Sequence, residues 1–250
     1  MSDIAVVTGA SRGIGAAIAS RLGADGYTVA VHYGQDSTAA ADVVEKITAA
    51  GSRAFSFATD LAEPDTGTAF WAAYDAAAGT LRDAPVRVLV NNAGIALHGV
   101  IEEFTAEDFN RQQQINVTAP FLIIKAALPR LADGGRVVNI SSAATRVALT
   151  DSIGYTMTKG AIEALTRPLA QHLGPRAITV NTVVPATTDT DMNASWLRGN
   201  SDVIAAIAGQ TALGRIGEPA DIADVVALLA SHDARWITAQ IIDVTGGIRL

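Results

Sequence analysis

The stretch Ile4-Ala-Val-Val-Thr-Gly-Ala-Ser-Arg-Gly-Ile-Gly15 decides the fold. Its leading apolar residues are typical of a buried strand, and the residues after Gly15 place apolar side chains at helical spacing. The glycines between them permit a tight turn and let backbone N–H groups approach a pyrophosphate at the start of the helix. Strand, glycine-rich turn and helix in this order predict a dinucleotide-binding unit; the alternative is a plain loop between a strand and a helix.

Short apolar runs and helical patterns alternate along the rest of the chain. Apolar runs that are continuous belong to a parallel sheet buried on both faces. The predicted strands are 4–7, 27–33, 54–58, 86–90, 136–140, 178–184 and 240–244, and the predicted helices are 14–24, 37–50, 64–78, 105–131, 152–173 and 218–231. We therefore expect an α/β fold, a single-domain Rossmann-like doubly wound parallel sheet of about seven strands with helices on both faces, over residues 1–250. The segment 185–215 is less regular and is predicted to be a mobile substrate lid.

Composition excludes several classes of function. The chain has no cysteine, which excludes disulfides, thiolate catalysis and cysteine-based metal sites. A net charge of −7 without a cluster of lysine and arginine disfavours nucleic acid and anionic membranes as partners. The histidines lack the spacing of metal ligands, so we expect no metal. Met1-Ser-Asp3 precedes the first strand directly, and no apolar stretch reaches the ~18 residues of a membrane span, so we expect a cytoplasmic protein without a signal peptide.

Tyr155 and Lys159 stand four residues apart in a predicted helix, with Ser142 upstream. This spacing places the two side chains on one helix face. A lysine ammonium beside a phenol favours the phenolate, so we expect the pKa of Tyr155 to lie below its usual value of about 10. Such a phenol can exchange a proton with an alcohol or a carbonyl group near neutral pH. The alternative interpretation is an exposed helix face.

The sequence resembles the short-chain dehydrogenase/reductase family from end to end. The motifs that carry the resemblance are Thr8-Gly-Ala-Ser-Arg-Gly-Ile-Gly15, Asp60-Leu61, Asn91-Asn-Ala-Gly94, the set Asn116, Ser142, Tyr155 and Lys159, Arg215-Ile-Gly-Glu-Pro219, and Ile237-Thr-Ala-Gln240. The chain is most similar to 3-oxoacyl-carrier-protein reductases, which admits an acyl carrier protein as a partner. The family also implies a homotetramer built on the two long predicted helices and the C-terminal segment.

The resemblance implies a catalytic role for four residues. Tyr155 is expected to be the general acid in carbonyl reduction and the base in the reverse reaction, and Lys159 is expected to lower its pKa and bind the nicotinamide ribose. Ser142 is expected to hold the substrate oxygen, and Asn116 a water that joins Lys159 to a proton relay. Ser141 is the alternative to Ser142, but Ser142 stands at the family spacing, thirteen residues before Tyr155.

The resemblance also implies a cofactor site. Its expected residues are Gly9, Ser11, Arg12, Gly13, Ile14, Gly15, His32, Tyr33, Asp60, Leu61, Asn92, Ala93, Gly94, Tyr155, Lys159, Pro185 and Thr190. The second strand ends without the carboxylate that usually binds the ribose of NAD, and Asp36 follows too late for that role. Arg12 is placed to pair with a 2′-phosphate, and His32 and Tyr33 are expected to add donors. NADP(H) is therefore favoured over NAD(H), whereas a merely solvated Arg12 would leave the choice open.

The expected substrate site is apolar. Its residues are Ile95, Ala96, Ala143, Ala144, Val147, Ile153, Ala186 and Trp196. They favour an apolar ketone or a β-keto acyl group. An acyl carrier protein would need basic surface, to which Arg130, Arg136 and Arg176 are the candidates, although Asp133 lies among them.

These observations predict an NADP(H)-dependent oxidoreductase that interconverts a ketone and a secondary alcohol. The alternative is a non-catalytic NADP(H)-binding sensor or scaffold on the same fold. Two departures from the family pattern concern glycines: Ala186 and Ala239 stand where the family usually has glycine.

Overall fold

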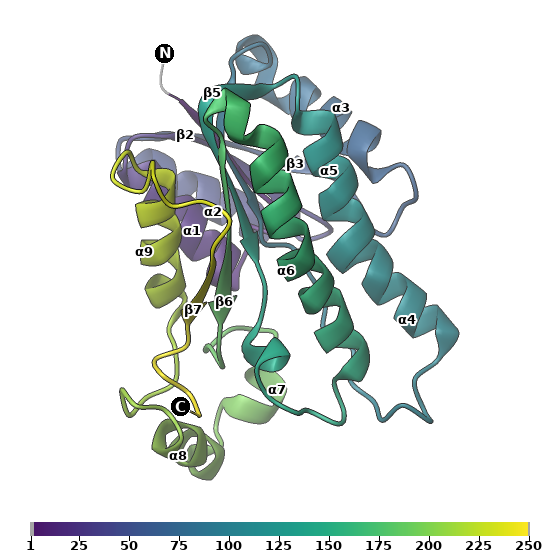
Figure 1. Cartoon of the computed structure of the whole chain (residues 1–250). Helices are drawn as coiled ribbons and strands as arrows, with labels where there is room; N and C mark the ends of the chain where they lie inside the picture. Colours follow the sequence, from purple (N-terminus) through teal and green to yellow (C-terminus); the bar gives the residue numbers. More distant parts are fainter. Residues whose placement is uncertain (1–2, 250) are drawn as a thin grey trace.

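A computed structural model describes residues 3–249, and within them a seven-stranded parallel sheet lies between two layers of helices (Figure 1). The strands are β1 (Ile4–Val7), β2 (Thr28–Tyr33), β3 (Arg53–Ala58), β4 (Val86–Asn91), β5 (Leu131–Ile140), β6 (Thr179–Pro185) and β7 (Ile241–Val244). They are arranged in the order β3-β2-β1-β4-β5-β6-β7. The winding reverses between β1 and β4, and such a switch point opens a crevice at the carboxyl ends of the strands. The predicted fold class is confirmed, and the ends of the domain predicted over 1–250 lie outside the described residues.

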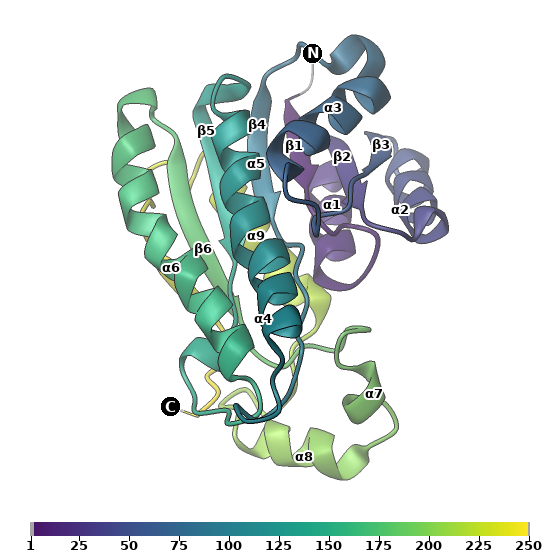
Figure 2. The ribbon, with the colours of Figure 1, turned by 90° about the vertical axis from the view of Figure 1, so that its right-hand side faces the viewer.

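The helices cover both faces of the sheet (Figure 2). They are α1 (Gly13–Ala24), α2 (Ser37–Ala49), α3 (Thr66–Ala78), α4 (Ala106–Gln113), α5 (Ala119–Ala127), α6 (Ile153–Leu173), α7 (Ala194–Leu197), α8 (Ser201–Gly209) and α9 (Pro219–Ala230). Helices α1, α2 and α9 pack on one face, and α3, α5 and α6 on the other. The short helices α7 and α8 lie beyond the carboxyl ends of the strands (Figure 1). None of the helices in the described part of the chain has the length and apolarity needed to cross a membrane.

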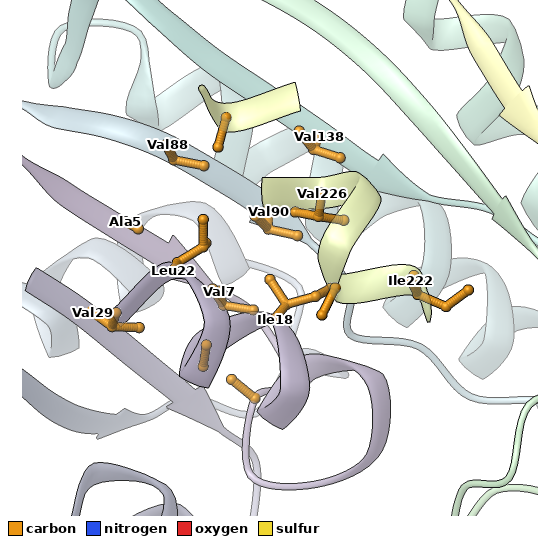
Figure 3. Close-up of a cluster of buried hydrophobic side chains, with 14 of the residues drawn as sticks. Ala5, Val7, Ile18, Leu22, Val29, Val88, Val90, Val138, Ile222 and Val226 are labelled. Atoms are coloured by element: carbon orange, nitrogen blue, oxygen red, sulfur yellow. The ribbon is translucent and has the colours of Figure 1, made fainter. Parts of the chain in front are cut away.

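Alternate residues of each strand feed two separate hydrophobic clusters, one on each face. Val7 and Val90 meet Ile18 of α1 and Val226 of α9 in the first cluster (Figure 3). The strand residues between them point into the second cluster, where Leu89 packs with residues of α3 and α5. Both faces of the central strands are buried, which explains why β1 is apolar at every position. Each fully buried aliphatic side chain contributes about 1.5–3 kcal/mol.

The helix predicted over 105–131 is not one continuous helix. The structure divides it into α4, a π-helical segment (Gln114–Thr118) and α5, and places Leu131 at the start of β5. Pro120 has no N–H to offer the carbonyl of Asn116 four residues earlier, so the regular α-helical pattern cannot continue there. The segment predicted as an irregular lid, 185–215, contains two short helices, α7 and α8.

Candidate active site

The four predicted catalytic residues meet at the carboxyl end of the sheet, beside the switch point. Ser142 follows β5, Tyr155 and Lys159 occupy the first turns of α6, and Asn116 lies in the π-helical segment. The Ser142 hydroxyl lies close enough to the Tyr155 hydroxyl to lower the pKa of the phenol. The Lys159 ammonium lies over the Tyr155 ring, 5.6 Å from the ring centroid. A Cβ atom added to Gly94 would lie 3.2 Å from Asn116 Oδ1 and 3.4 Å from Lys159 Nζ, so the Asn91–Gly94 segment borders the same group.

The ionisation of Tyr155 differs from the expectation. Burial raises the pKa of Tyr155, and the hydrogen bond from Ser142 opposes this shift. Lys159 does not supply the expected depression, because its ammonium donates to the carbonyl oxygen of Ile140 at 2.9 Å and faces the ring rather than the hydroxyl. Burial lowers the pKa of Lys159 to about 8. Ser142 is therefore the direct polar partner of the phenol, since a hydrogen bond to the charged form favours that form.

Asn116 uses its whole side chain to join three segments. Its Oδ1 accepts from the Ile95 amide at 2.9 Å, and its Nδ2 donates to the Ile95 carbonyl at 2.8 Å and to Thr158 Oγ1 at 3.1 Å. These bonds fix the loop after β4 against α6. A cavity of about 10 Å³, room for roughly one water, is lined by Asn116, Lys159, Asn91 and Thr8 among others. The Asn91 Oδ1 atom is buried and has no partner among the described residues.

The glycine turn is packed tightly against the end of β4. Gly9 has φ +60, and a Cβ atom there would lie 2.8 Å from Ala93 Cα. Thr8 Oγ1 accepts from the amides of Asn92 and Ala93, both at 2.9 Å. The Asn92 side chain donates back to the carbonyls of Thr8 at 2.9 Å and Gly9 at 3.0 Å. Asn92 and Ala93 therefore shape the turn. Thr8, the first residue of the motif Thr8–Gly15, also shapes the turn. The sequence analysis did not include Thr8 in the cofactor site.

His32 corrects one prediction. It is 1% exposed and lies among the rings of Phe57 and Phe70. Its Nδ1 accepts from the Gly9 amide at 3.1 Å, and its Nε2 lies 3.1 Å from the Thr59 carbonyl, to which it donates in the neutral tautomer that this arrangement requires. Both ring nitrogens are used within the fold, so His32 offers no donor to a phosphate. Burial lowers its pKa to about 4.

The remaining cofactor candidates surround the start of α1. Arg12 is exposed at the N-cap of α1, and the first turn of this helix contains no acidic residue. A Cβ atom on Gly13 would lie 3.4 Å from Thr190, so these two candidates face each other. The carboxylate of Asp36 accepts from the Ala39 amide at 3.0 Å and caps α2 instead of reaching the turn. The positive end of the α1 dipole has no acidic residue beside it and has Arg12 next to it. This positive charge suits the phosphates of a dinucleotide.

The other cofactor candidates lie in the glycine turn, on the two hydrophobic clusters and at the ends of strands. Ser11 is partly buried in the turn, and Ile14 and Tyr33 pack on the first hydrophobic cluster. Asp60 is exposed and its carboxylate accepts from the Ala62 amide at 2.9 Å, whereas Leu61 is buried in the second cluster. Pro185 ends β6, and Gly15 is pressed against Gly9, so that a Cβ atom there would lie 2.2 Å from the Gly9 carbonyl oxygen.

Comparison with known proteins identifies the family. A family model described as enoyl-(acyl carrier protein) reductase matches residues 9–249. Versicolorin reductase stcU of Emericella nidulans is 37% identical over 98% of this chain and 94% of its own. The crystal structure of the angucycline C-6 ketoreductase LanV with bound NADP is 44% identical, with a TM-score of 0.91 over 99% of this chain and 95% of LanV. A short-chain dehydrogenase/reductase from Serratia marcescens is 35% identical, with a TM-score of 0.90 over 99% of this chain and 98% of that one.

The chain belongs to the short-chain dehydrogenase/reductase family. Relatives at this identity are oxidoreductases, and the structures of LanV and the Serratia enzyme superimpose over nearly the whole chain. The family predicted from the sequence motifs is confirmed.

The arginines considered for a carrier-protein surface are bonded internally in this short-chain dehydrogenase/reductase. Arg130 forms two bonds of 2.7 Å with Asp75 and lies over the Trp71 ring. Arg136 is buried and donates to the carbonyls of residues 134, 135 and 231. Arg176 donates to Asp133 at 2.8 Å and to two backbone carbonyls. Their charges are used to hold the fold together and do not form a basic patch.

Apolar side chains surround the entrance to the site. They lie on the loop after β4, the loop before α6 and the segment 185–215. The exposed large ones are Val100, Ile101, Leu149, Ile153, Met192, Trp196 and Leu213. The sequence interpretation named only Ile153 and Trp196 among these, because irregular loops carry no periodic signal. The first two segments are joined by a bond of 2.8 Å from the Gly99 amide to the Asp151 carbonyl, and by His98 Nδ1 at 3.0 Å from Ser152 Oγ.

The charged residues of the segment 185–215 other than Asp202 are paired with each other or with α9. Arg198 bonds Asp189 and Asp191, both at 2.9 Å. Arg215 bonds Asp221 at 2.6 Å. The entrance therefore presents apolar surface beside neutralised charges.

Proposed function

We propose that this short-chain dehydrogenase/reductase is an NADP(H)-dependent carbonyl reductase, which interconverts an apolar cyclic ketone and the secondary alcohol. The observation that carries the proposal is the placement of the Ser142 hydroxyl beside the Tyr155 phenol, with Lys159 buried next to them, near the glycine turn. Because the hydroxyls of Ser142 and Tyr155 lie side by side, both can reach the carbonyl oxygen of one substrate. LanV, a ketoreductase with bound NADP, and versicolorin reductase support the same class of reaction.

In this proposal Tyr155 donates a proton to the carbonyl oxygen, and Ser142 stabilises the charge that develops there through its own hydrogen bond. Lys159, whose ammonium lies over the phenol ring, would bind the nicotinamide ribose, as the family resemblance implies. Asn116 fixes the loop after β4 to α6, and the cavity that it shares with Lys159 has room for a water of the relay. When bound, NADPH supplies the hydride that reduces the carbonyl carbon.

The glycine turn and the start of α1 would hold the pyrophosphate, with Gly13 and Thr190 on either side. Arg12 would pair with the 2′-phosphate, which gives the preference for NADP(H) over NAD(H). Asp60 and Leu61 would receive the adenine, as the family resemblance implies. Within the described residues, no group of three His, Cys, Asp or Glu side chains is placed to hold a metal ion.

The apolar entrance supports a broad, hydrophobic substrate. Met192 and Trp196 on the segment 185–215 would close over it as a lid, opposite Leu149 and Ile153. The names of LanV and versicolorin reductase point to fused-ring ketones as the class to try first. An acyl carrier protein has less support, since Arg130 is paired with Asp75, and Arg176, the most exposed of the considered arginines, is paired with Asp133. The homotetramer and the cytoplasmic location stay predictions from the sequence.

Turnover on a ketone panel tests the proposal. NADPH oxidation would be followed by absorbance with fused-ring aromatic ketones, a β-keto thioester and an α,β-unsaturated thioester, and each assay would be repeated with NADH. The expected result is turnover of fused-ring ketones with NADPH, lost in Tyr155→Phe while the cofactor still binds. Tight NADPH binding without turnover on any substrate would favour the non-catalytic module, and turnover of the unsaturated thioester alone would refute the ketone assignment.

A further inference from the structure

Glu163 lies on α6, on the same face as Tyr155 and Lys159. The three residues are spaced by four, so their side chains follow one another along the helix. The Glu163 side chain is only 12% exposed. A carboxylate with so little solvent needs polar partners within the fold. The proposed reaction gives it no role.

The hydrogen-bond partners of Glu163 lie on both sides of Ser142 in the sequence. Its Oε1 accepts from Ser141 Oγ at 2.8 Å and from Thr145 Oγ1 at 2.7 Å. Its Oε2 accepts from Arg146 Nη1 at 2.9 Å. One carboxylate on α6 therefore holds both ends of the segment 141–146, which we call the Ser142 turn.

The Ser142 turn is also closed on itself and tied to the last strand. The Thr145 amide donates to the Ser142 carbonyl at 3.1 Å, and the Ala144 amide donates to Ser142 Oγ at 3.2 Å. Arg146 donates through Nη1 to Thr145 Oγ1 at 2.8 Å and through Nε to Asp243 of β7 at 3.2 Å. The turn is thus a closed unit, and the Glu163 carboxylate makes its shortest bonds to α6. Two longer bonds join the same elements, from Ser141 Oγ to the Lys159 carbonyl at 3.4 Å and from Thr156 Oγ1 to the Ala144 carbonyl at 3.5 Å. Hydrogen bonds to a carboxylate are short and strong, which suits a link that fixes geometry.

We infer that Glu163 is a positioning residue, which holds Ser142 in place beside Tyr155 by binding Ser141, Thr145 and Arg146. Tyr155 is fixed by α6, and Ser142 lies on a separate segment, so their distance depends on what joins the two. The inference rests on the proposed function for its catalytic consequence. The competing explanation is a tie that stabilises the fold without affecting the pair.

Glu163→Gln is the main test. The amide keeps the shape of the side chain but loses the charge. The NH2 group that replaces one carboxylate oxygen is itself a donor, so it cannot accept a hydrogen bond from Ser141, Thr145 or Arg146. We expect kcat to fall about tenfold while KM for NADPH stays unchanged. The Tyr155 phenol should titrate at higher pH, because the Ser142 bond that favours the phenolate weakens. That titration would be read from phenolate absorbance, as the difference between each protein and its Tyr155→Phe derivative.

Two controls separate positioning from simple stabilisation. Asp75→Asn removes a bidentate pair with Arg130 away from the site and should lower Tm without changing kcat or the Tyr155 titration. In a Ser142→Ala background, Glu163→Gln should have no further effect on kcat, since the residue that it positions is gone. If Glu163→Gln behaves like Asp75→Asn, or acts equally in the Ser142→Ala background, the inference is wrong.

Failure of the variant to fold would not end the test. Thr145→Val and Arg146→Gln each remove one bond to Glu163, and each should lower kcat by about threefold and shift the Tyr155 titration to higher pH; wild-type behaviour in both would overturn the inference. If the wild-type protein reduces none of the ketones, the proposed function fails. The phenolate titration still decides the role of Glu163 in that case, because it needs no turnover.

Discussion

Acidification below pH 6.5 should destabilise the fold through His32. In the folded protein this imidazole must be neutral, because Nδ1 accepts from the Gly9 amide and only Nε2 carries a proton toward the Thr59 carbonyl. Protonation would place two N–H groups face to face in a buried site. Burial accordingly lowers the pKa from 6.5 to about 4. The unfolded chain therefore binds this proton at a higher pH than the folded chain does.

The sign and size of the effect follow from this difference. Stability from His32 is complete above pH 6.5 and is lost as the pH falls toward 4, since the unfolded state gains the proton first. The difference between the two pKa values corresponds to a loss of about 2 kcal/mol at pH 5 and about 3 kcal/mol at pH 4. This is a large part of the about 5–15 kcal/mol that stabilises a typical domain.

Urea unfolding at pH 7, 6 and 5 measures the effect, with His32→Asn as the matched variant. The asparagine oxygen can accept from the Gly9 amide as Nδ1 does, and the side chain has no proton to gain in this range. Its shorter side chain does not reach Thr59, a loss that is the same at every pH. Other titrating groups contribute equally to both proteins. The free energy of unfolding of wild type relative to the variant should fall by about 2 kcal/mol between pH 7 and pH 5. A difference that stays constant over this range would refute the reasoning.

Three further substitutions test the proposed site and one strained residue. Tyr155→Phe should lower kcat by about 10²- to 10⁴-fold with little change in NADPH binding, measured by cofactor fluorescence; a near-full rate would remove the proton-donor role. Arg12→Ala should raise KM for NADPH about 10- to 100-fold and leave KM for NADH unchanged, whereas equal loss would unlink Arg12 from the 2′-phosphate. Ala239 has φ +62, in the left-handed region that favours glycine, so Ala239→Gly should raise the free energy of unfolding by about 1 kcal/mol. The control is Ala50→Gly, at φ −79, which should lower the free energy of unfolding; Tm measures both changes.

The sheet was predictable because burial on both faces leaves a clear record in the sequence. Continuous apolar runs such as Ile4–Val7 can be recognised without knowledge of their neighbours. The division of the helix over 105–131 was not recognised, because its apolar spacing continues through the π-helical segment. Pro120 was the available signal, since it removes a backbone donor in the middle of the pattern.

The grouping of the four predicted catalytic residues followed from the family resemblance, but the partners of these residues could not be predicted. Tyr155 and Lys159 lie on one helix, so their relation is local. The role of His32 depends on which face of β2 is covered by Phe57 and Phe70, which the sequence of that strand does not specify. Glu163 could be placed on the Tyr155 face by counting along the helix. Its partners precede it by 17 to 22 residues, and only the folded sheet brings them together.

The site therefore divides into two parts that obey different constraints. The groups proposed for proton transfer are held by buried side chains on regular elements, as Asn116 holds the loop after β4 and Glu163 holds the Ser142 turn. Small errors in such positions are costly for chemistry, which explains why the supporting bonds are buried and mostly between 2.7 and 3.1 Å. The entrance is formed by loops whose apolar residues, Met192 and Trp196 among them, make no such bonds through their side chains. Substitutions there can change which ketone fits without moving Tyr155, so the choice of substrate can vary while the reaction stays the same.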